Sequence, residues 1–523
     1  MEKKLSINSE NILPIIKKWL YSEKDIFLRE LVSNSSDAIT KLKVVDPKAK
    51  DYRIDIKIDK DKKTLTIKDN GIGMSFEDVE KYISQIAFSG AEEFLKKYKS
   101  QDEKEQIIGH FGLGFYSAFM VSEKVQIKTQ SHIKKEKSVL WQSDGSTKYT
   151  IEKLAPIKRG TEVTLFIEKD NLEFLEEANI KNILLKYCPF FPYPIYLNDN
   201  HLNNKDPLWL KNPSSLKDKD YLEFYKDLYP FELDPIFWVH LNVDYPFKLQ
   251  GILYFSKITT NIDLNKTQVK LFSNRVFVSD NAKDVLPKFL TMLKGAIDSP
   301  DIPLNVSRSY LQVDQTVRQL SNHISKKVVS KLSTLYKLER EKFISYWSDI
   351  EVIIKLGILD DEKFYEKAKE FLIFENHEKK WTTIEEYLQR HEKQDKVFYT
   401  SKDKSDPLLD IYIEKNIEVL FLNSYIDTAL ISFLEQKQNT KFIRIDGSID
   451  NTILDPSKEK NLIDESGRSL SSKIAEFFKS SLDDKIEIEA KSLSSANIPS
   501  FIMIKEEERR LKDYMQFTQN TTL

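Results

Sequence analysis

The sequence predicts an α+β protein, and two patterns in the first part of the chain support this prediction. Residues 22–43 carry apolar side chains at the spacing typical of an amphipathic helix. RIDIKID and TLTIKDN then alternate apolar and polar residues, and the KDKK between them indicates a hairpin. Three further segments read as strands with turns between them: VSEKVQIKTQ, SVLWQSDGSTKYTIEKL and GTEVTLFIEK. Successive short strands beside helices predict an antiparallel sheet with helices packed on one face.

Changes in composition predict where the domains meet. A chain of 523 residues suggests about three domains. Residues 201–220 are rich in Asn, Pro, Ser and Lys, so we expect a linker between a first domain at 1–200 and a second at 221–446. Strand patterns restart after this linker, and a long helical pattern follows at about 310–350. Another polar stretch, at about 446–470, predicts a third domain at 447–523.

Composition and charge argue against several classes of protein. The chain is 40% hydrophobic and its formal net charge is −2, unlike a strongly basic nucleic-acid binder. The single cysteine, Cys188, excludes an internal disulfide and a multi-thiolate zinc site, and its apolar flanks favour a buried thiol in a reducing compartment. The N-terminus has no signal-peptide pattern and no run approaches 18 apolar residues. We therefore expect a cytoplasmic protein without a membrane span.

Glycine is concentrated in one short part of the chain. Six of the 13 glycines lie between Gly71 and Gly114, and three of these are in GHFGLG at 109–114, ahead of the helix-like FYSAFMV. Glycine is tolerated where φ is positive or where the backbone lies against a ligand, and a cluster of glycines exposes N–H groups to an anion. The spacing matches neither the Walker A nor the dinucleotide-binding motif. The cluster indicates an anion-binding loop of another kind.

A polar stripe runs along the first predicted helix. Glu30, Asn34, Asp37 and Lys41 are spaced by four, three and four residues, which places them on one side of a helix with about 100° per residue. A solvated stripe supported by i,i+4 pairs is the simpler explanation of this pattern alone. Asparagine has a mediocre propensity for the middle of a helix, which favours a functional reason. The segment KDNGIGM at 68–74 also has two interpretations, a tight turn and a binding loop.

Taken in order, these segments resemble the Bergerat (GHKL) ATP-binding fold. The order is Glu-x-x-x-Asn on a helix, Asp-x-Gly-x-Gly after a strand, a glycine loop at a helix start, and Gly-Thr at 160–161. Four longer segments are similar to the heat-shock protein 90 family of the bacterial HtpG type: IFLRELVSNSSDAITKL, DNGIGM, IIGHFGLGFYSAFMV and GAIDSPDIPLNVSRSYLQ. The resemblance covers essentially the whole chain. It implies a Bergerat-type α/β sandwich, an α/β middle domain and a partial α/β C-terminal domain.

The resemblance also implies an activity, that of an ATP-dependent chaperone which hydrolyses ATP to ADP and phosphate, closes, and assists the folding of clients, including under stress. Glu30 would be the general base for the attacking water, and Asn34 would coordinate a Mg²⁺ that bridges the triphosphate. Asp69 would accept a hydrogen bond from the adenine amino group. The other ATP-binding residues that the resemblance implies are Asp37, Ala38, Lys41, Gly73, Met74, Gly90, Gly109, Phe111, Gly112, Gly114, Phe115 and Thr161. Met74 and Phe115 would line the base and sugar, and Thr161 would hold the Asp69 side of the base. The loop glycines would offer N–H groups to the phosphates. Gly90 and Gly109 would be the hinges of a lid.

Two residues of the second domain complete the implied site. Arg308 would reach the γ-phosphate when the domains close, and Gln312 would assist it. Without the resemblance, an arginine at this position would be read as an ordinary surface charge. The chain departs from the family at Tyr82 and Phe88, where many members have Asn and Lys. A phenyl ring cannot replace a cation at a phosphate, so we do not expect Tyr82 and Phe88 to make the ribose and phosphate contacts that the lid makes in those family members.

The resemblance implies partners as well: unfolded or partly folded client proteins and co-chaperones, with no nucleic acid and no membrane. Trp209 is either a client contact or packing. The segment SSANIPSFIMIKEEERRLKDYMQF is similar to the early part of the family's dimerisation domain, and the chain ends at Leu523. We therefore expect the homodimer of the family to be weak at this chain length. Two alternatives remain: an ATPase of the mismatch-repair or topoisomerase class, which Arg308 and the net charge disfavour, and a nucleotide-binding scaffold without hydrolysis.

Overall fold

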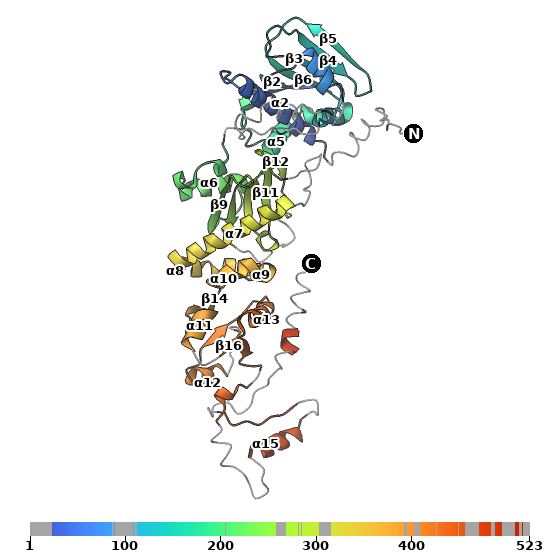
Figure 1. The fold of residues 1–523 in the computed structure, drawn as a ribbon. Coiled ribbons are helices and arrows are strands. Elements are labelled where there is room, and N and C mark those ends of the chain that lie inside the picture. The colour runs from blue at the N-terminus through green and yellow to red at the C-terminus, as the bar shows by residue number, and fades with distance from the viewer. Residues whose placement is uncertain are drawn as a thin grey trace, which may run out of the picture. The chain divides into compact units, whose positions relative to one another are not determined.

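The computed structural model describes most of the chain. The described residues are 23–85, 88, 108, 112–203, 205–257, 268–280, 282–283, 285–302, 315–391, 395–401, 408–424, 426–447, 449–455, 470–482, 487–493, 508–511 and 515. They fall into two compact units (Figure 1). The first unit comprises Met1–Lys257, Asn265–Pro287 and Leu293–Ile324, and the second comprises Ile258–Leu264, Lys288–Met292 and Ser325–Leu523.

An eight-stranded sheet in the order β5-β4-β3-β6-β2-β1-β7-β8 opens the first unit. Its strands are β1 (Ile54–Asp59), β2 (Thr64–Asp69), β3 (Ser122–Gln130), β4 (Ser138–Ser143), β5 (Tyr149–Leu154), β6 (Gly160–Ile167), β7 (Ile195–Leu197) and β8 (Asn200–His201). The strands and the hairpin predicted from the alternating segments are confirmed. The prediction of a purely antiparallel sheet is wrong for one pair, because β7 lies parallel to β1. The long connection that carries the chain back from β6 permits this parallel pairing.

Helices pack against this sheet through a shared apolar core. They are α2 (Ile26–Val45), α3 (Phe76–Tyr82), η2 (Gly114–Met120), η3 (Lys169–Leu175) and α5 (Glu177–Tyr187). Phe27 and Leu31 of α2 are buried in one cluster with Ile56 and Ile67 of the strands. The amphipathic helix predicted at 22–43 is therefore present as α2. The helix-like FYSAFMV forms the 3-10 helix η2 rather than an α-helix.

A second, five-stranded sheet in the order β12-β11-β13-β10-β9 also belongs to the first unit. Its strands are β9 (Phe237–Val243), β10 (Leu249–Phe255), β11 (Gln268–Ser273), β12 (Val276–Ser279) and β13 (Lys294–Asp298). The sheet packs against η4 (Leu208–Leu210) and α6 (Asp218–Leu228), and η5 (Pro213–Ser215) lies between these two helices in the chain. Trp209 is fully buried in this core beside Phe190 and Phe272. Trp209 is therefore a packing residue, and the alternative of a client contact at its ring is wrong.

Helix α7 (Gln315–Leu338) begins in the first unit and continues into the second. The second unit has a sheet in the order β15-β14-β17-β16-β18. These strands are β14 (Ile373–Asn376), β15 (Trp381–Thr383), β16 (Lys396–Thr400), β17 (Val419–Phe421) and β18 (Lys441–Arg444). The helices are η6 (Lys288–Leu290), α8 (Arg340–Ser345), α9 (Trp347–Asp360), α10 (Glu362–Ala368), α11 (Ile384–Arg390), α12 (Leu409–Glu414), α13 (Asp427–Gln438), η7 (Asn451–Ile453) and α15 (Leu470–Lys479). The helical pattern predicted at about 310–350 corresponds to α7, α8 and the start of α9.

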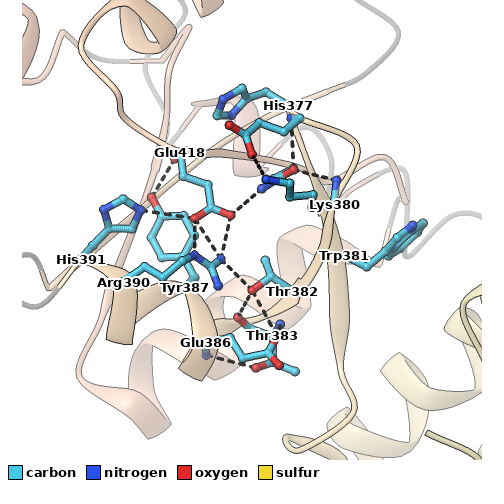
Figure 2. A network of polar contacts seen from close by, with 12 residues as sticks. His377, Lys380, Trp381, Thr382, Thr383, Glu386, Tyr387, Arg390, His391 and Glu418 are labelled. Atoms are coloured by element: carbon cyan, nitrogen blue, oxygen red, sulfur yellow. Dashed lines mark hydrogen bonds and ion pairs between the residues drawn. The ribbon is translucent and has the colours of Figure 1, made fainter. Parts of the chain in front are cut away.

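A buried carboxylate ties the sheet of the second unit to helix α11 (Figure 2). Glu418 accepts hydrogen bonds from Asn376 at 2.7 Å and from Arg390 at 2.8 Å on Oε1. Its Oε2 accepts from Arg390 Nε at 3.1 Å and Nη2 at 2.9 Å and lies 3.3 Å from His391 Nε2. Tyr387 donates to the Glu418 carbonyl at 2.8 Å. Partners surround both carboxylate oxygens, so the network is a structural anchor.

Two further expectations concern single features of the chain. Cys188 is buried, as its flanks predicted, and this burial raises the pKa of the thiol, which keeps it protonated. Within the described part of the chain, no helix combines the length and the apolar character needed to cross a membrane.

Candidate active site

The polar stripe of α2 lies within a largely buried helix. Glu30 and Asp37 are 5% and 7% exposed, whereas Asn34 between them is exposed. Asp37 Oδ1 accepts a hydrogen bond from the backbone N–H of Ile108 at 2.8 Å, next to the first glycine of the 109–114 loop. Burial lowers the pKa of Lys41, and the charges of Asp37 and Asp78 oppose this effect. The stripe is therefore not a solvated face.

Asp69 is the last residue of β2 and is 5% exposed. Its Oδ1 accepts a hydrogen bond from the Gly71 N–H at 2.8 Å. Burial raises the pKa of Asp69 to about 7, although the Gly71 and Thr161 backbones and the Ser35 hydroxyl favour the ionised form. A buried acceptor at a strand end suits recognition of one donor group on a ligand.

The loop after Asp69 fits tightly against α2 and β3. A Cβ added to Gly71 would come within 2.5 Å of the Ala38 backbone, and the Ile72 N–H donates to the Ala38 carbonyl at 3.0 Å. Gly73 has φ +63°, and a Cβ there would lie 1.8 Å from the Gln130 carbonyl oxygen. Both positions therefore require glycine. This geometry is compatible with both interpretations of KDNGIGM, a tight turn and a binding loop.

Thr129, on β3, joins this loop to the neighbouring strand β6. Its hydroxyl accepts from the Met74 N–H at 2.9 Å, and it is 3.0 Å from the Thr161 hydroxyl. Thr161 is paired in register with both Asp69 and Thr129. Antiparallel pairing across three strands thus brings together residues that are far apart in the sequence.

The glycines of the second loop approach two other parts of the site. A Cβ on Gly112, which has φ +65°, would lie 2.6 Å from the Phe88 carbonyl oxygen. A Cβ on Gly114 would lie 2.5 Å from Glu30 Oε2. Phe115, 8% exposed, packs its ring against Tyr116, Phe119 and Trp141. This loop therefore meets α2 at Glu30, while the end of β2 meets the same helix at Ser35 and the loop after β2 meets it at Ala38.

Arg29 is the immediate neighbour of Glu30 and is bound to it. The guanidinium donates to Glu30 Oε1 from Nη2 at 2.8 Å and from Nε at 3.2 Å. Arg29 is only 1% exposed, so the pair is held within the protein. One carboxylate oxygen of Glu30 thus faces Arg29, and the other lies against the backbone of Gly114.

At the two positions that depart from the family, the aromatic rings stack. The Tyr82 and Phe88 ring centroids are 6.0 Å apart with an interplanar angle of 20°. The Lys81 ammonium lies 5.2 Å from the centroid of the Tyr82 ring and 5.5 Å from that of Phe88. A cation is thus present near position 88, supplied by Lys81.

Five predicted site residues lie outside the described residues: Gly90, Gly109, Phe111, Arg308 and Gln312. The structure brings together Glu30, Ala38, Asp69, Gly73, Met74, Gly114 and Thr161 through the contacts above. Sequence reasoning missed Arg29, Ser35 and Thr129. Arg29 and Ser35 are next to predicted site residues on α2, and this position could have indicated a role in the site. Thr129 is the second-last residue of a strand, and nothing in the sequence around it indicated such a role.

Comparison with known proteins places the chain in a family. Residues 197–506 match the model of the Hsp90 protein family, and residues 22–170 match that of the histidine kinase-, DNA gyrase B- and HSP90-like ATPases. The chain is 43% identical to a chaperone protein HtpG of Bacteroides fragilis, over 97% of this chain and 79% of the relative. It belongs to the HSP90 family.

Other HSP90 relatives show the same relationship. The HtpG of Porphyromonas gingivalis is 44% identical over 87% of this chain and 71% of its own length. That of Buchnera aphidicola is 35% identical over 90% of this chain and 80% of its own length. The protein is an ATP-dependent chaperone with a nucleotide-binding ATPase domain of the Bergerat type. The alternative of a scaffold without hydrolysis is therefore wrong, as is that of a mismatch-repair or topoisomerase subunit.

Proposed function

We propose that both glycine loops and the stripe on α2 form a single ATP site, whose hydrolysis drives the conformational closure that assists client folding, including under stress. The observation that carries this proposal is that the two loops close on one helix. Asp69, at the end of β2, contacts α2 at Ser35, the loop after β2 contacts it at Ala38, and Gly114 contacts it at Glu30. One helix thus has contacts suited to both ends of a nucleotide.

Asp69 recognises the adenine end. Its carboxylate accepts the hydrogen bond of the adenine amino group, and the Gly71 N–H and Ser35 hydroxyl hold it in place. Thr161, held by Thr129, supports the same side of the base. The other residues that we assign to the base and sugar are Met74, Phe115, Asp37, Ala38, Lys41 and Gly73.

Asn34 and the glycines serve the phosphate end. Asn34 is exposed on α2 and offers one amide oxygen, a donor set that fits a Mg²⁺ whose other ligands are phosphate oxygens and water. Such an ion would neutralise charge on the triphosphate. Backbone N–H groups at Gly112 and Gly114 face the phosphates. Outside the described residues, Gly90, Gly109 and Phe111 complete the lid and loop.

Glu30 is the general base that accepts a proton from the attacking water. Arg29 holds Oε1, so Oε2 is directed along the glycine loop on the phosphate side. Arg308 and Gln312, from the segment beyond the described residues, stabilise the transferred phosphoryl group.

The wider assignments are parts of the same proposal. We assign the ATPase domain to 1–200, a linker to 201–220, a middle domain to 221–446 and a C-terminal domain to 447–523. The HSP90 family implies client proteins and, usually, dimers. Co-chaperones and a cytoplasmic location are proposed for this chain.

Calorimetry with a non-hydrolysable ATP analogue tests the site. Asp69→Asn should weaken binding by about 100-fold or more, because an amide presents a donor where the adenine amine needs an acceptor. Asp59→Asn, at the end of the neighbouring strand β1, is the matched control and should leave affinity unchanged. Unchanged affinity in Asp69→Asn would remove Asp69 from the site.

A further inference from the structure

Tyr187 connects the neighbourhood of Glu30 to the five-stranded sheet. It is the last residue of α5 and is 3% exposed. The guanidinium carbon of Arg29 lies 5.5 Å from the centroid of its ring. The ring of Phe277, on β12, lies 5.9 Å from the same ring between centroids. One aromatic side chain therefore contacts both the arginine that binds Glu30 and a strand of the second sheet.

The hydroxyl of Tyr187 holds the start of α2. It lies 3.1 and 3.2 Å from the two oxygens of Asp25, the residue before the helix, and 3.3 Å from Glu23. Burial, with the nearby carboxylates adding to it, raises the pKa of Tyr187 to about 12, so the hydroxyl stays protonated and donates. Lys186 pairs with the same carboxylates at 3.0 and 3.1 Å. The start of α2, which carries Arg29 and Glu30, is thus anchored to the end of α5.

The hairpin of β11 and β12 has a second contact, with the end of β13. In its turn, the Arg275 N–H donates to Asp298 Oδ2 at 3.0 Å. Asp298 is buried and ends β13, shortly before the segment that contains Arg308 in sequence. The same hairpin therefore contacts Tyr187 through Phe277 and the strand leading to Arg308 through Arg275.

We propose that Tyr187 is a positioning residue for ATP hydrolysis: it transmits the position of Phe277 through Arg29 to Glu30. The proposal rests on the role of Glu30 as general base in the proposed function. Arg29 is buried and bound to Glu30, so a shift of the Tyr187 ring moves the carboxylate with the guanidinium. A misplacement of about 1 Å at a catalytic group can cost about 100-fold in rate without changing substrate affinity.

The test compares two substitutions at Tyr187 in the full chain. Tyr187→Leu removes the ring and should lower kcat for phosphate release by about 10-fold, with KM and the affinity for a non-hydrolysable analogue changed by less than about 2-fold. Tyr187→Phe keeps the ring contacts with Arg29 and Phe277 and should retain kcat to within about 3-fold. Leu185→Ala, at an exposed position of the same helix, should behave like the parent.

Phe277→Leu approaches the same contact from β12 and should lower kcat by about 3-fold with unchanged affinity. If circular dichroism shows that Tyr187→Leu does not fold, Phe277→Leu is the test: a parental kcat in this variant would contradict the proposal. Parental kcat in the folded Tyr187→Leu variant, or equal losses in Tyr187→Leu and Tyr187→Phe, would overturn the proposal. Glu30→Ala in the same assay separates the two hypotheses: retained hydrolysis there refutes the base assignment itself, whereas lost hydrolysis with a parental Tyr187→Leu refutes only the positioning role.

Discussion

Glu30 in the first unit and Glu418 in the second are both buried glutamates bound to an arginine. Glu418 is 8% exposed and Glu30 is 5% exposed. Arg390 and His391 contact the carboxylate of Glu418 (Figure 2), and Asn376 donates to its Oε1, so both oxygens have partners. At Glu30, the arginine binds Oε1, while Oε2 lies against a glycine of a loop that we assign to the phosphates.

The difference shows how the surroundings of a carboxylate decide its use. A carboxylate whose two oxygens are enclosed by donors cannot take a proton from water without breaking several hydrogen bonds, so it contributes to stability. At Glu30, the arginine at Oε1 fixes the orientation of the carboxylate, and Oε2 lies beside a glycine of the proposed ligand loop. Burial and an arginine partner alone would not separate the two cases.

Replacing Glu30 should have the largest effect. Glu30→Ala removes the proposed base and should lower ATP hydrolysis by about 10²- to 10⁴-fold while the protein still binds nucleotide. Phosphate release and calorimetry measure the two quantities. Glu418→Ala is the control for removing a buried glutamate, and it should hydrolyse ATP at a rate within about 2-fold of the parent. A similar loss in both variants would abolish the distinction between the two carboxylates.

Gly114→Ala sharpens the comparison without removing the carboxylate. The φ of Gly114 is not in the left-handed region, so alanine is tolerated by the backbone, but its Cβ would lie 2.5 Å from Glu30 Oε2. We expect hydrolysis to fall by about 10- to 100-fold as the carboxylate is displaced. Single-turnover kinetics should show that the chemical step slows. If the rate were parental, Oε2 would not need its place beside Gly114.

Glu418→Ala should destabilise the second unit. Loss of the carboxylate leaves the buried Asn376 amide without this acceptor, which costs about 1 to 3 kcal/mol. The Arg390 side chain is 48% exposed and contributes little, because water can solvate it. Urea unfolding should show the loss, and Glu385→Ala, an exposed glutamate of α11, should not. Equal stability of the two variants would contradict the anchoring role of the network.

Asp69 is a third buried carboxylate, and the smallest expected effect is that of its titration on the stability of the nucleotide-free protein. Its pKa is raised from 3.8 to about 7 in the folded protein, so the folded state retains a proton that the unfolded state has lost between these values. Stability should therefore fall as the pH rises through about 7, by about 1 kcal/mol between pH 6 and 7. Asp69→Asn lacks this titration. Melting of the nucleotide-free proteins from pH 5 to 8 should show the variant gaining stability relative to the parent, and a constant difference would refute the raised pKa.

The local pattern of the sequence determined the elements that position the site. Period-two alternation predicted β1, β2, β3 and β6, and helical spacing predicted α2 with Glu30, Asn34 and Asp37 on one side. The order of short motifs along the chain identified the family. These signals survive in a single sequence because they depend on neighbours within a turn of helix or a few residues of strand.

Only the tertiary structure decided what each of these residues touches. The pairing of Asp69 with Thr161, the contact of Gly114 with Glu30 and the ring of Tyr187 beside Arg29 join segments far apart in sequence. The same holds for the parallel pair β1 and β7, which the sequence did not predict, and for the choice between packing and client contact at Trp209. Such contacts depend on strand register and on how helices pack, and these are set by the whole core rather than by local periodicity. The tertiary packing around a glutamate with an arginine partner therefore decides whether the glutamate anchors the fold or faces a ligand loop.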